Sequence, residues 1–278
     1  NEQLLIPIVY GELSSVGDTE RGAIPAYRVD PAVGGPLFVY VVARHVCKSV
    51  DAVYNYGVKM SPTDYTVGTA FYGGVEMTVL TFAVDPLNPN RSITEPEITV
   101  DVKGKTYDGK ASGELIENPV DQLVDFMKVY CSVSQNDIDA GSSATEAESQ
   151  GYKGAAWIGG DVVDRIEIVN RFASSFNMPV FVGRGGAVTV RLLTIENFFN
   201  PSATRTISDE VEIVRSSFEG WGNLEVASSV EYHYVRRWAE EGEQYGRKLT
   251  QLTVGEDARL GQEILITRFA PYVRDPAT

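Results

Sequence analysis

Apolar residues recur at helical spacing in the first part of the stretch from Asn118 to Leu193. Intervals of three and four residues between apolar positions place them on one face of a helix. Asn118 can accept hydrogen bonds from the free N–H groups of a first turn, and Pro119 suits the first helical position because no donor is needed there. We therefore predict a helix that starts at Asn118-Pro119. Its apolar face consists of Val120, Leu123, Val124, Met127 and Cys131.

A second helix is predicted after Gly159-Gly160, with Asp161 as its capping residue. Asn177 and Pro179 end this helix. Alternating apolar residues on both sides of the glycine-rich turn 183–186 then predict a hairpin. The apolar face of the second helix consists of Val162, Ile166, Val169, Ala173 and Phe176.

The sequence on both sides of this segment has β character. Runs of β-branched and aromatic residues, separated by turn residues, are typical of short strands in a sandwich or small barrel. Between the two helices, residues 132–160 are polar and predict a long loop with a short helix at 144–150. The predicted strands are 37–46, 75–84, 98–102, 210–215, 225–237 and 261–273.

Together these elements predict a β-rich α+β fold with three parts. Residues 1–117 are expected to form an N-terminal β-barrel-like or sandwich domain, and residues 196–278 a second β domain. A helical α/β segment, residues 118–195, is expected to join the two domains.

The chain of 278 residues carries a formal net charge of −14. Contact with phosphates needs clustered Lys and Arg, so this charge argues against a nucleic-acid-binding surface. Two readings of the acid stay open: it keeps the protein soluble, or it forms a wall past which DNA moves without adhering. Cys47 and Cys131 stand far apart and are predicted to be free thiols, as expected in a reducing cytoplasm. No apolar run reaches the roughly 20 residues of a membrane-spanning helix.

No residue pattern predicts catalysis, and we assign no catalytic, cofactor-binding or metal-binding residue. His45 and Cys47 alternate along one strand, but a zinc site or a Ser/His/Asp triad would need partners that the one other histidine, His233, does not supply. The pair Glu240-Glu241 has the chemistry of a glycosidase, although such pairs arise by chance among 38 acidic residues. A partial match to a calcium loop, with its turn glycine one position early, contains Asp137, Asp139, Gly141, Glu146 and Glu148.

Four stretches open the β domain, start the first helix, end the second helix and lead into the late β region. They are Pro7–Gly11, Asn118–Val124 followed by Asn136–Asp139, Phe172–Asn177 followed by Pro179–Val182, and Val230–Tyr234. In their order and spacing they resemble the baseplate-hub and tail-tip proteins of tailed bacteriophages, a family with relatives in gene-transfer agents.

The resemblance implies a structural virion protein that assembles as three copies around an axis, closes the tail tube and lets DNA pass on infection. It implies contacts with tail-tube and baseplate proteins, synthesis in the host cytoplasm, no enzyme activity, no cofactor and no transmembrane segment. Two other readings stay open. One is a glycosidase directed at the cell wall, and the other is a receptor- or carbohydrate-binding module that gathers exposed Trp and Tyr residues on one sheet face.

Overall fold

The computed structural model describes residues 6–15, 22–29, 38–84, 86, 98–159, 164–183, 185–193, 229–236, 245–252, 265–270 and 272–275. The chain forms two compact units. The first contains Asn1–Leu192, His233–Arg247 and Phe269–Thr278, and the second contains Leu193–Tyr232 and Lys248–Arg268. The cores and contacts analysed below belong to the first unit.

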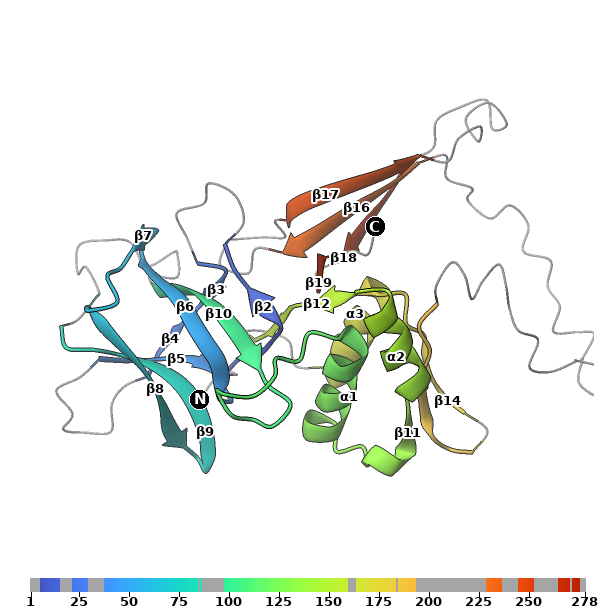
Figure 1. Cartoon of the computed structure of the whole chain (residues 1–278), viewed down its shortest axis with the longest axis horizontal. Helices are drawn as coiled ribbons and strands as arrows, with labels where there is room; N and C mark the ends of the chain where they lie inside the picture. The colour runs from blue at the N-terminus through green and yellow to red at the C-terminus, as the bar shows by residue number, and fades with distance from the viewer. Residues whose placement is uncertain are drawn as a thin grey trace, which may run out of the picture. The chain divides into compact units, whose positions relative to one another are not determined.

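The elements follow one another as a β-rich half, a mixed middle and a final group of strands (Figure 1). The first half contains β1 (Ile8–Tyr10), β2 (Glu12–Leu13), β3 (Ile24–Pro25), β4 (Tyr27–Val29), β5 (Phe38–Ala43), β6 (Cys47–Asn55), β7 (Val58–Lys59), β8 (Tyr65–Tyr72), β9 (Val75–Phe82) and β10 (Ile98–Lys105). The middle contains α1 (Pro119–Tyr130), a 3-10 turn (Gln135–Asp137), β11 (Ile138–Asp139), α2 (Gly141–Ser149), β12 (Lys153–Gly154), β13 (Ala156–Ile158), α3 (Arg165–Ser175), β14 (Val180–Val182) and β15 (Val188–Val190). The last strands are β16 (Ser229–Arg236), β17 (Tyr245–Leu252), β18 (Leu265–Ala270) and β19 (Val273–Asp275).

Two antiparallel sheets form a sandwich in the first half of the chain. One has the strand order β4-β5-β9-β8, and the other has the order β2-β10-β6-β7 with β3 also paired to β10. Apolar side chains that alternate along β5, β9, β6 and β10 meet between the sheets in one core, as the period of two of a strand requires. In the residues that the structure describes, neither sheet closes into a barrel. The predicted β-rich α+β class is confirmed, and the N-terminal β part is an open sandwich.

Strand β1 serves two cores at once. It pairs antiparallel with β13, in a register that sets Ile8 opposite Ile158. Because successive side chains of a strand point to opposite faces, Val9 enters the sandwich core while Ile8 and Tyr10 enter a second core built from the helices. Val9 and Tyr10 are fully buried. This strand therefore fixes the sandwich and the helical layer to each other.

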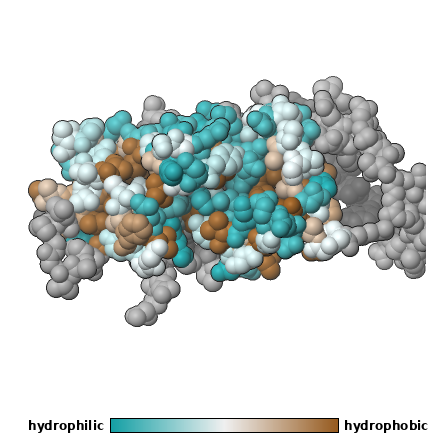
Figure 2. Space-filling view, turned by 60° about the horizontal axis from the view of Figure 1, so that its bottom comes forward, coloured by the Kyte–Doolittle hydropathy of each residue, from teal (hydrophilic) through white to brown (hydrophobic). Residues whose placement is uncertain are grey.

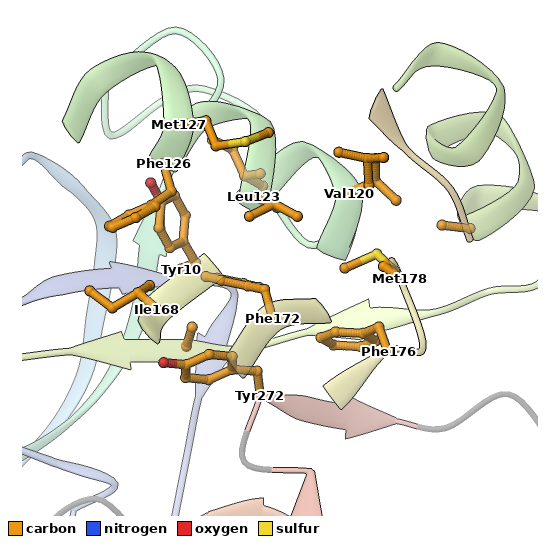
Figure 3. Close-up of a cluster of buried hydrophobic side chains, with 14 of the residues drawn as sticks. Tyr10, Val120, Leu123, Phe126, Met127, Ile168, Phe172, Phe176, Met178 and Tyr272 are labelled. Carbon is orange, nitrogen blue, oxygen red and sulfur yellow. The ribbon is translucent and has the colours of Figure 1, made fainter. Parts of the chain in front are cut away.

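Helix α1 supplies one wall of the second core. Its N-cap is Asn118, whose side-chain oxygen accepts a hydrogen bond from the N–H of Val120 at 3.0 Å, which confirms the predicted start. Leu123 and Met127 of the predicted stripe are buried, and Phe126 beside them is buried too. Figure 3 shows these side chains facing Tyr10 and the aromatic residues of α3.

Gln122 is a polar residue at the centre of this apolar wall. It is completely buried, and its Nε2 donates to the carbonyl oxygens of Ile116 and Gly154, each at 2.8 Å. Both N–H donors of the amide are used in this way, while its Oε1 is buried without a hydrogen-bond partner. The amide therefore joins the entry to α1 with strand β12, a role that helical periodicity does not reveal.

Helix α3 differs from its prediction in its start and in part of its buried face. Phe176 is buried and Val169 packs against the core, as predicted. The N-cap is Asp164, whose carboxylate accepts from the N–H of Ile166 at 2.8 Å, so Asp161 does not cap the helix. Ile166 was predicted on the apolar face but is 69% exposed, whereas Ile168 and Phe172 are buried. Aromatic residues far away in sequence determine which face of α3 is buried. The centroid of the Phe172 ring lies 4.6 Å from that of the Tyr272 ring and 6.5 Å from that of the Tyr10 ring.

The region between α1 and α3 is folded, so the prediction of a long loop is wrong there. Helix α2 confirms the predicted short helix and begins at Gly141. Strands β11, β12 and β13 each pair with a strand far away in sequence, namely β15, β19 and β1. The Ser143 hydroxyl on α2 donates to the Val190 carbonyl at 2.9 Å, which holds the helix on β15.

The predicted hairpin is confirmed as β14 and β15, which pair in register from Val180↔Val190 to Val182↔Val188. The predicted continuous strand 37–46 ends at Ala43, and β6 begins at Cys47 after a break that positions His45.

The predicted strand 210–215 lies outside the described residues. The division of the chain after residues 117 and 195 remains a prediction.

Asp101 closes the β2–β3 end of the sandwich. Its Oδ1 accepts from the N–H groups of Ser15 and Ala23, at 2.8 and 3.0 Å, and its Oδ2 accepts from the hydroxyls of Ser15 and Tyr54, at 3.0 and 3.1 Å. The carboxylate is buried. Four donors converge on one side chain, so its loss leaves several of them without an acceptor.

We expect Asp101→Ala to lower the free energy of unfolding by about 2 kcal/mol, because buried N–H groups lose a charged acceptor. Asp101→Asn keeps one oxygen for the two N–H groups and should cost about half as much. Urea unfolding of both variants measures the difference. Equal losses for the two substitutions would contradict the assigned role of the carboxylate.

Candidate functional site

A polar cluster lies where the sandwich meets α1. Asp125 Oδ2 accepts from the Tyr10 hydroxyl at 2.5 Å and from Lys105 Nζ at 2.6 Å. The Lys105 ammonium also lies 5.9 Å from the centre of the Tyr130 ring. Burial and the Asp125 charge raise the pKa of the Tyr10 hydroxyl well above its usual value. Three elements, β1, β10 and α1, are thus joined through one carboxylate oxygen.

His45 extends this cluster on the sandwich side. Its Nε2 accepts from the N–H of Val9 at 3.0 Å, so the ring proton sits on Nδ1 and is donated to the Val46 carbonyl at 3.1 Å. The side chain is buried. Burial lowers the pKa of His45 to about 4, and the nearby Lys105 charge acts in the same direction. The neutral ring therefore fastens β1 to the sandwich.

The pH dependence of stability follows from the lowered pKa of His45. The unfolded chain binds a proton at about pH 6.5, whereas the folded chain resists protonation until about pH 4. His45 therefore stabilises the fold fully above about pH 6.5, and this contribution falls as the pH falls towards 4. We expect a loss of about 2 kcal/mol between pH 6.5 and 5.

Unfolding free energies of the natural chain and of His45→Gln, measured across this pH range, test the prediction. Glutamine does not titrate, so the variant should be less stable at pH 7 and should show a flatter profile between pH 6.5 and 5. Parallel profiles for the two proteins would refute the role of His45.

The cluster has the residue types of a catalytic site but not the arrangement of one. The Tyr10 hydroxyl, both ring nitrogens of His45 and the Oδ2 of Asp125 are held by backbone or side-chain partners, and Tyr10 is fully buried. Catalysis needs a base or nucleophile that a substrate can reach. We therefore interpret the cluster as the joint between the two cores.

The residues considered for metal binding are buried, paired with another side chain or located on a helix. Cys47 is buried, and burial raises the pKa of its thiol to about 12, which disfavours the thiolate that a metal needs. Asp139 forms an ion pair with Arg191 at 2.6 Å, while Glu146 and Glu148 lie on helix α2 and not in a loop. Within the described residues, no three His, Cys, Asp or Glu side chains are grouped as metal ligands.

The structure also bears on the predicted free cysteines and on the search for a membrane-spanning helix. Cys47 and Cys131 are free cysteines, as predicted. The acidic pair at residues 240–241 lies outside the described residues. None of the helices that the structure describes is long and apolar enough to cross a membrane.

Strand β8 is an uncharged strand at the end of a sheet. It ends the order β4-β5-β9-β8, and β9 is its one described strand partner (Figure 1). The alternate N–H and C=O groups of an edge strand point away from its neighbour and can pair with another strand. Over eight residues, Tyr-Thr-Val-Gly-Thr-Ala-Phe-Tyr, β8 has no charged residue and no proline.

One face of β8 has apolar side chains that extend from the sandwich core to the surface. Tyr65 and Val67 stand opposite Phe82 and Leu80 of β9, which are buried in the sandwich core. Further along the same face, Val67 is 41% exposed and Phe71 is 72% exposed. The hairpin turn Gly73-Gly74 has positive φ at both residues, 60° and 81°, as a two-residue turn requires.

Strand β14 is a second edge of this kind. It ends the order β11-β15-β14, and its residues are Val180, Phe181 and Val182. Phe181 is 49% exposed and Val182 is 70% exposed, on opposite faces of the strand. On the face shown in Figure 2, hydrophobic residues form small patches among hydrophilic ones.

Sequence reasoning did not find these two edges. The absence of charge from β8, in a chain with 62 acidic and basic residues in total, is the signal that could have drawn attention to it. Which strand ends a sheet is decided by the pairing order, and that order is visible only in the structure.

No family model and no curated protein matches the sequence. A comparison of folds finds a chain in the structure described as "Virion of native gene transfer agent (GTA) particle". The two chains superpose with a TM-score of 0.51 over 100% of this chain and 71% of that chain, at 12% sequence identity. At this identity the similarity is one of fold.

Proposed function

We propose that this chain is a structural subunit of a phage-like virion, located in the tail, where it forms the baseplate hub or tail tip. The observation that carries the proposal is the fold, which is shared along the whole chain with a chain of a gene transfer agent virion. The order of stretches that resembles the hub and tail-tip family supports the same reading.

The surface of the first unit supports an assembly role. Exposed, uncharged strand edges are avoided by proteins that remain single, because they pair with other chains. β8 and β14 are such edges, and both carry large exposed apolar side chains. In the proposed function these edges are covered by other copies or by neighbouring tail proteins.

The proposed assembly has three copies around an axis and closes the tail tube until DNA passes. Three identical subunits close around one axis through heterologous contacts. The net charge of −14 per chain fits a wall that a polyanion can pass without adhering. Contacts with tail-tube and baseplate proteins complete the proposal.

Mass measurement and localisation together test this function. Light scattering of the purified chain should give a homo-oligomer with the mass of a trimer. An epitope tag on the chain, detected with gold-labelled antibody in purified particles, should mark one end of the tail. A chain that is monomeric at every concentration and absent from purified particles would refute the proposal, and hydrolysis of purified cell walls by the chain would favour the glycosidase reading.

A further inference from the structure

We propose that edge strand β8 of one copy pairs with edge strand β14 of the next copy, so that identical chains join head to tail. This inference rests on the proposed function, since it names the partner surface of the assembly. It concerns two edges of the first unit that belong to different sheets and different cores.

Charged residues and proline are distributed unevenly over the strand edges. Proteins protect exposed edges with charged residues or proline, which discourage pairing with another chain. Among the described strands at sheet ends, nine contain such a residue in their sequence. They are β2, β3, β4, β7, β11, β12, β17, β18 and β19, with Glu12, Pro25, Arg28, Lys59, Asp139, Lys153, Lys248, Arg268 and Arg274, respectively. β1 and β13 lack such residues but are largely buried. Exposed edges without this protection are β8 and β14 alone in this set.

Symmetry favours a contact between two different edges. Pairing of β8 with β8 of another copy would use the same surface twice and would stop at a two-fold dimer, leaving β14 uncovered. Pairing of β8 with β14 uses two different surfaces of each chain. Such heterologous contacts repeat from copy to copy and close into a ring when the rotation allows it. The head-to-tail contact is therefore the one that covers both edges in every subunit.

The contact between β8 and β14 covers exposed apolar side chains. Val67 and Phe71 are exposed on one face of β8, and Phe181 and Val182 extend from the two faces of β14. A strand added beside β8 brings its own side chains against those of its neighbour, about 5 Å away. Full burial of each such side chain is worth about 1.5–3 kcal/mol before the costs of association. The shorter β14 covers part of the eight residues of β8.

Charge substitutions at the two edges test the pairing. Val67→Lys and Val182→Glu each place a charge on an exposed valine of one edge, so each should weaken the oligomer at least tenfold in dissociation constant. Both substitutions in one chain give every contact one Lys and one Glu, and assembly should recover at least partly. Val58→Lys is the matched control, because Val58 is 68% exposed on β7, where Lys59 already protects the edge.

The oligomer mass of all four variants is measured by light scattering, and their thermal unfolding checks that each is folded. Weakening by both single changes, rescue by the double change and a neutral control would support the pairing. Assembly that is insensitive to Val67→Lys or Val182→Glu, or that the double change does not rescue, would overturn it while leaving the proposed function intact. A natural chain that stays monomeric and is absent from purified particles would overturn both.

Discussion

Gly104→Ala is expected to lower the free energy of unfolding by about 3 kcal/mol or more, which is a large part of the stability of an ordinary domain. A Cβ atom on Gly104 would lie 2.3 Å from the Val9 carbonyl oxygen and 2.6 Å from its carbonyl carbon. These are backbone atoms of β1, so no side-chain rotation relieves the overlap. The substitution should push β1 away from β10 and loosen the hydrogen bond, 2.8 Å long, between the Gly104 N–H and the Gly11 carbonyl.

Gly141→Ala is the control for this substitution. A Cβ atom on Gly141 meets nothing within 4 Å, and the residue is the first of helix α2, where alanine is a better helix former. Chemical denaturation should show a change of less than about 0.5 kcal/mol, or a gain. Similar stability of the Gly104 and Gly141 variants would show that β1 and β10 can separate at little cost.

Phe172→Ala should destabilise the fold by about 3–5 kcal/mol, the usual range for removing a buried aromatic ring. The Phe172 ring is completely buried between Tyr10 of β1 and Tyr272 ahead of β19 (Figure 3). Its removal leaves a cavity that three elements from distant parts of the chain must share. Relaxation into that cavity is limited because Tyr10 is tied to Asp125.

Ile166→Ala in the same helix separates the loss of a core contact from the loss of a helical side chain. Ile166 is exposed, so its change should cost less than about 1 kcal/mol. Thermal unfolding followed by near-ultraviolet circular dichroism reports both the stability and the packing of the aromatic residues. A larger loss for Ile166→Ala than for Phe172→Ala would mean that α3 buries its predicted face, not the face described here.

Local sequence signals predicted the start of α1 correctly, but they did not predict the start and the whole buried face of α3. Asn118 and Pro119 start α1 as predicted because capping depends on neighbouring residues alone. In α3 the sequence offers two apolar stripes, one through Ile166 and one through Phe172. The choice between them is made by Tyr10 and Tyr272, which pack on Phe172 from about 160 and 100 residues away in the chain.

The polar region 132–160 shows a second reason for failure. Its strands are two or three residues long, too short to display an alternating pattern, and they exist because β1, β15 and β19 lie beside them. Gln122 shows a third reason for failure. A glutamine is normally read as a surface residue of a helix, so the pattern of apolar residues does not predict that Gln122 is buried. Its hydrogen bonds to two carbonyls justify its burial, and these partners are known only from coordinates.

The candidate assembly surface was predictable in composition but not in position. The sequence shows that residues 65–72 lack charge and favour a strand, and that Gly73-Gly74 suits a hairpin turn. Exposure of β8 follows from its place at the end of a sheet, and exposure of β14 follows in the same way. Edge positions are a property of the whole pairing order, which local sequence does not encode.

The double role of β1 also has a consequence for biosynthesis. β1 leaves the ribosome before its pairing partner β13, which follows about 150 residues later. At roughly 5–20 residues per second, this delay lasts about 10–30 s. During that interval Ile8, Val9 and Tyr10 have no β13 to pair with, neither core can be completed, and these apolar side chains stay accessible to other chains.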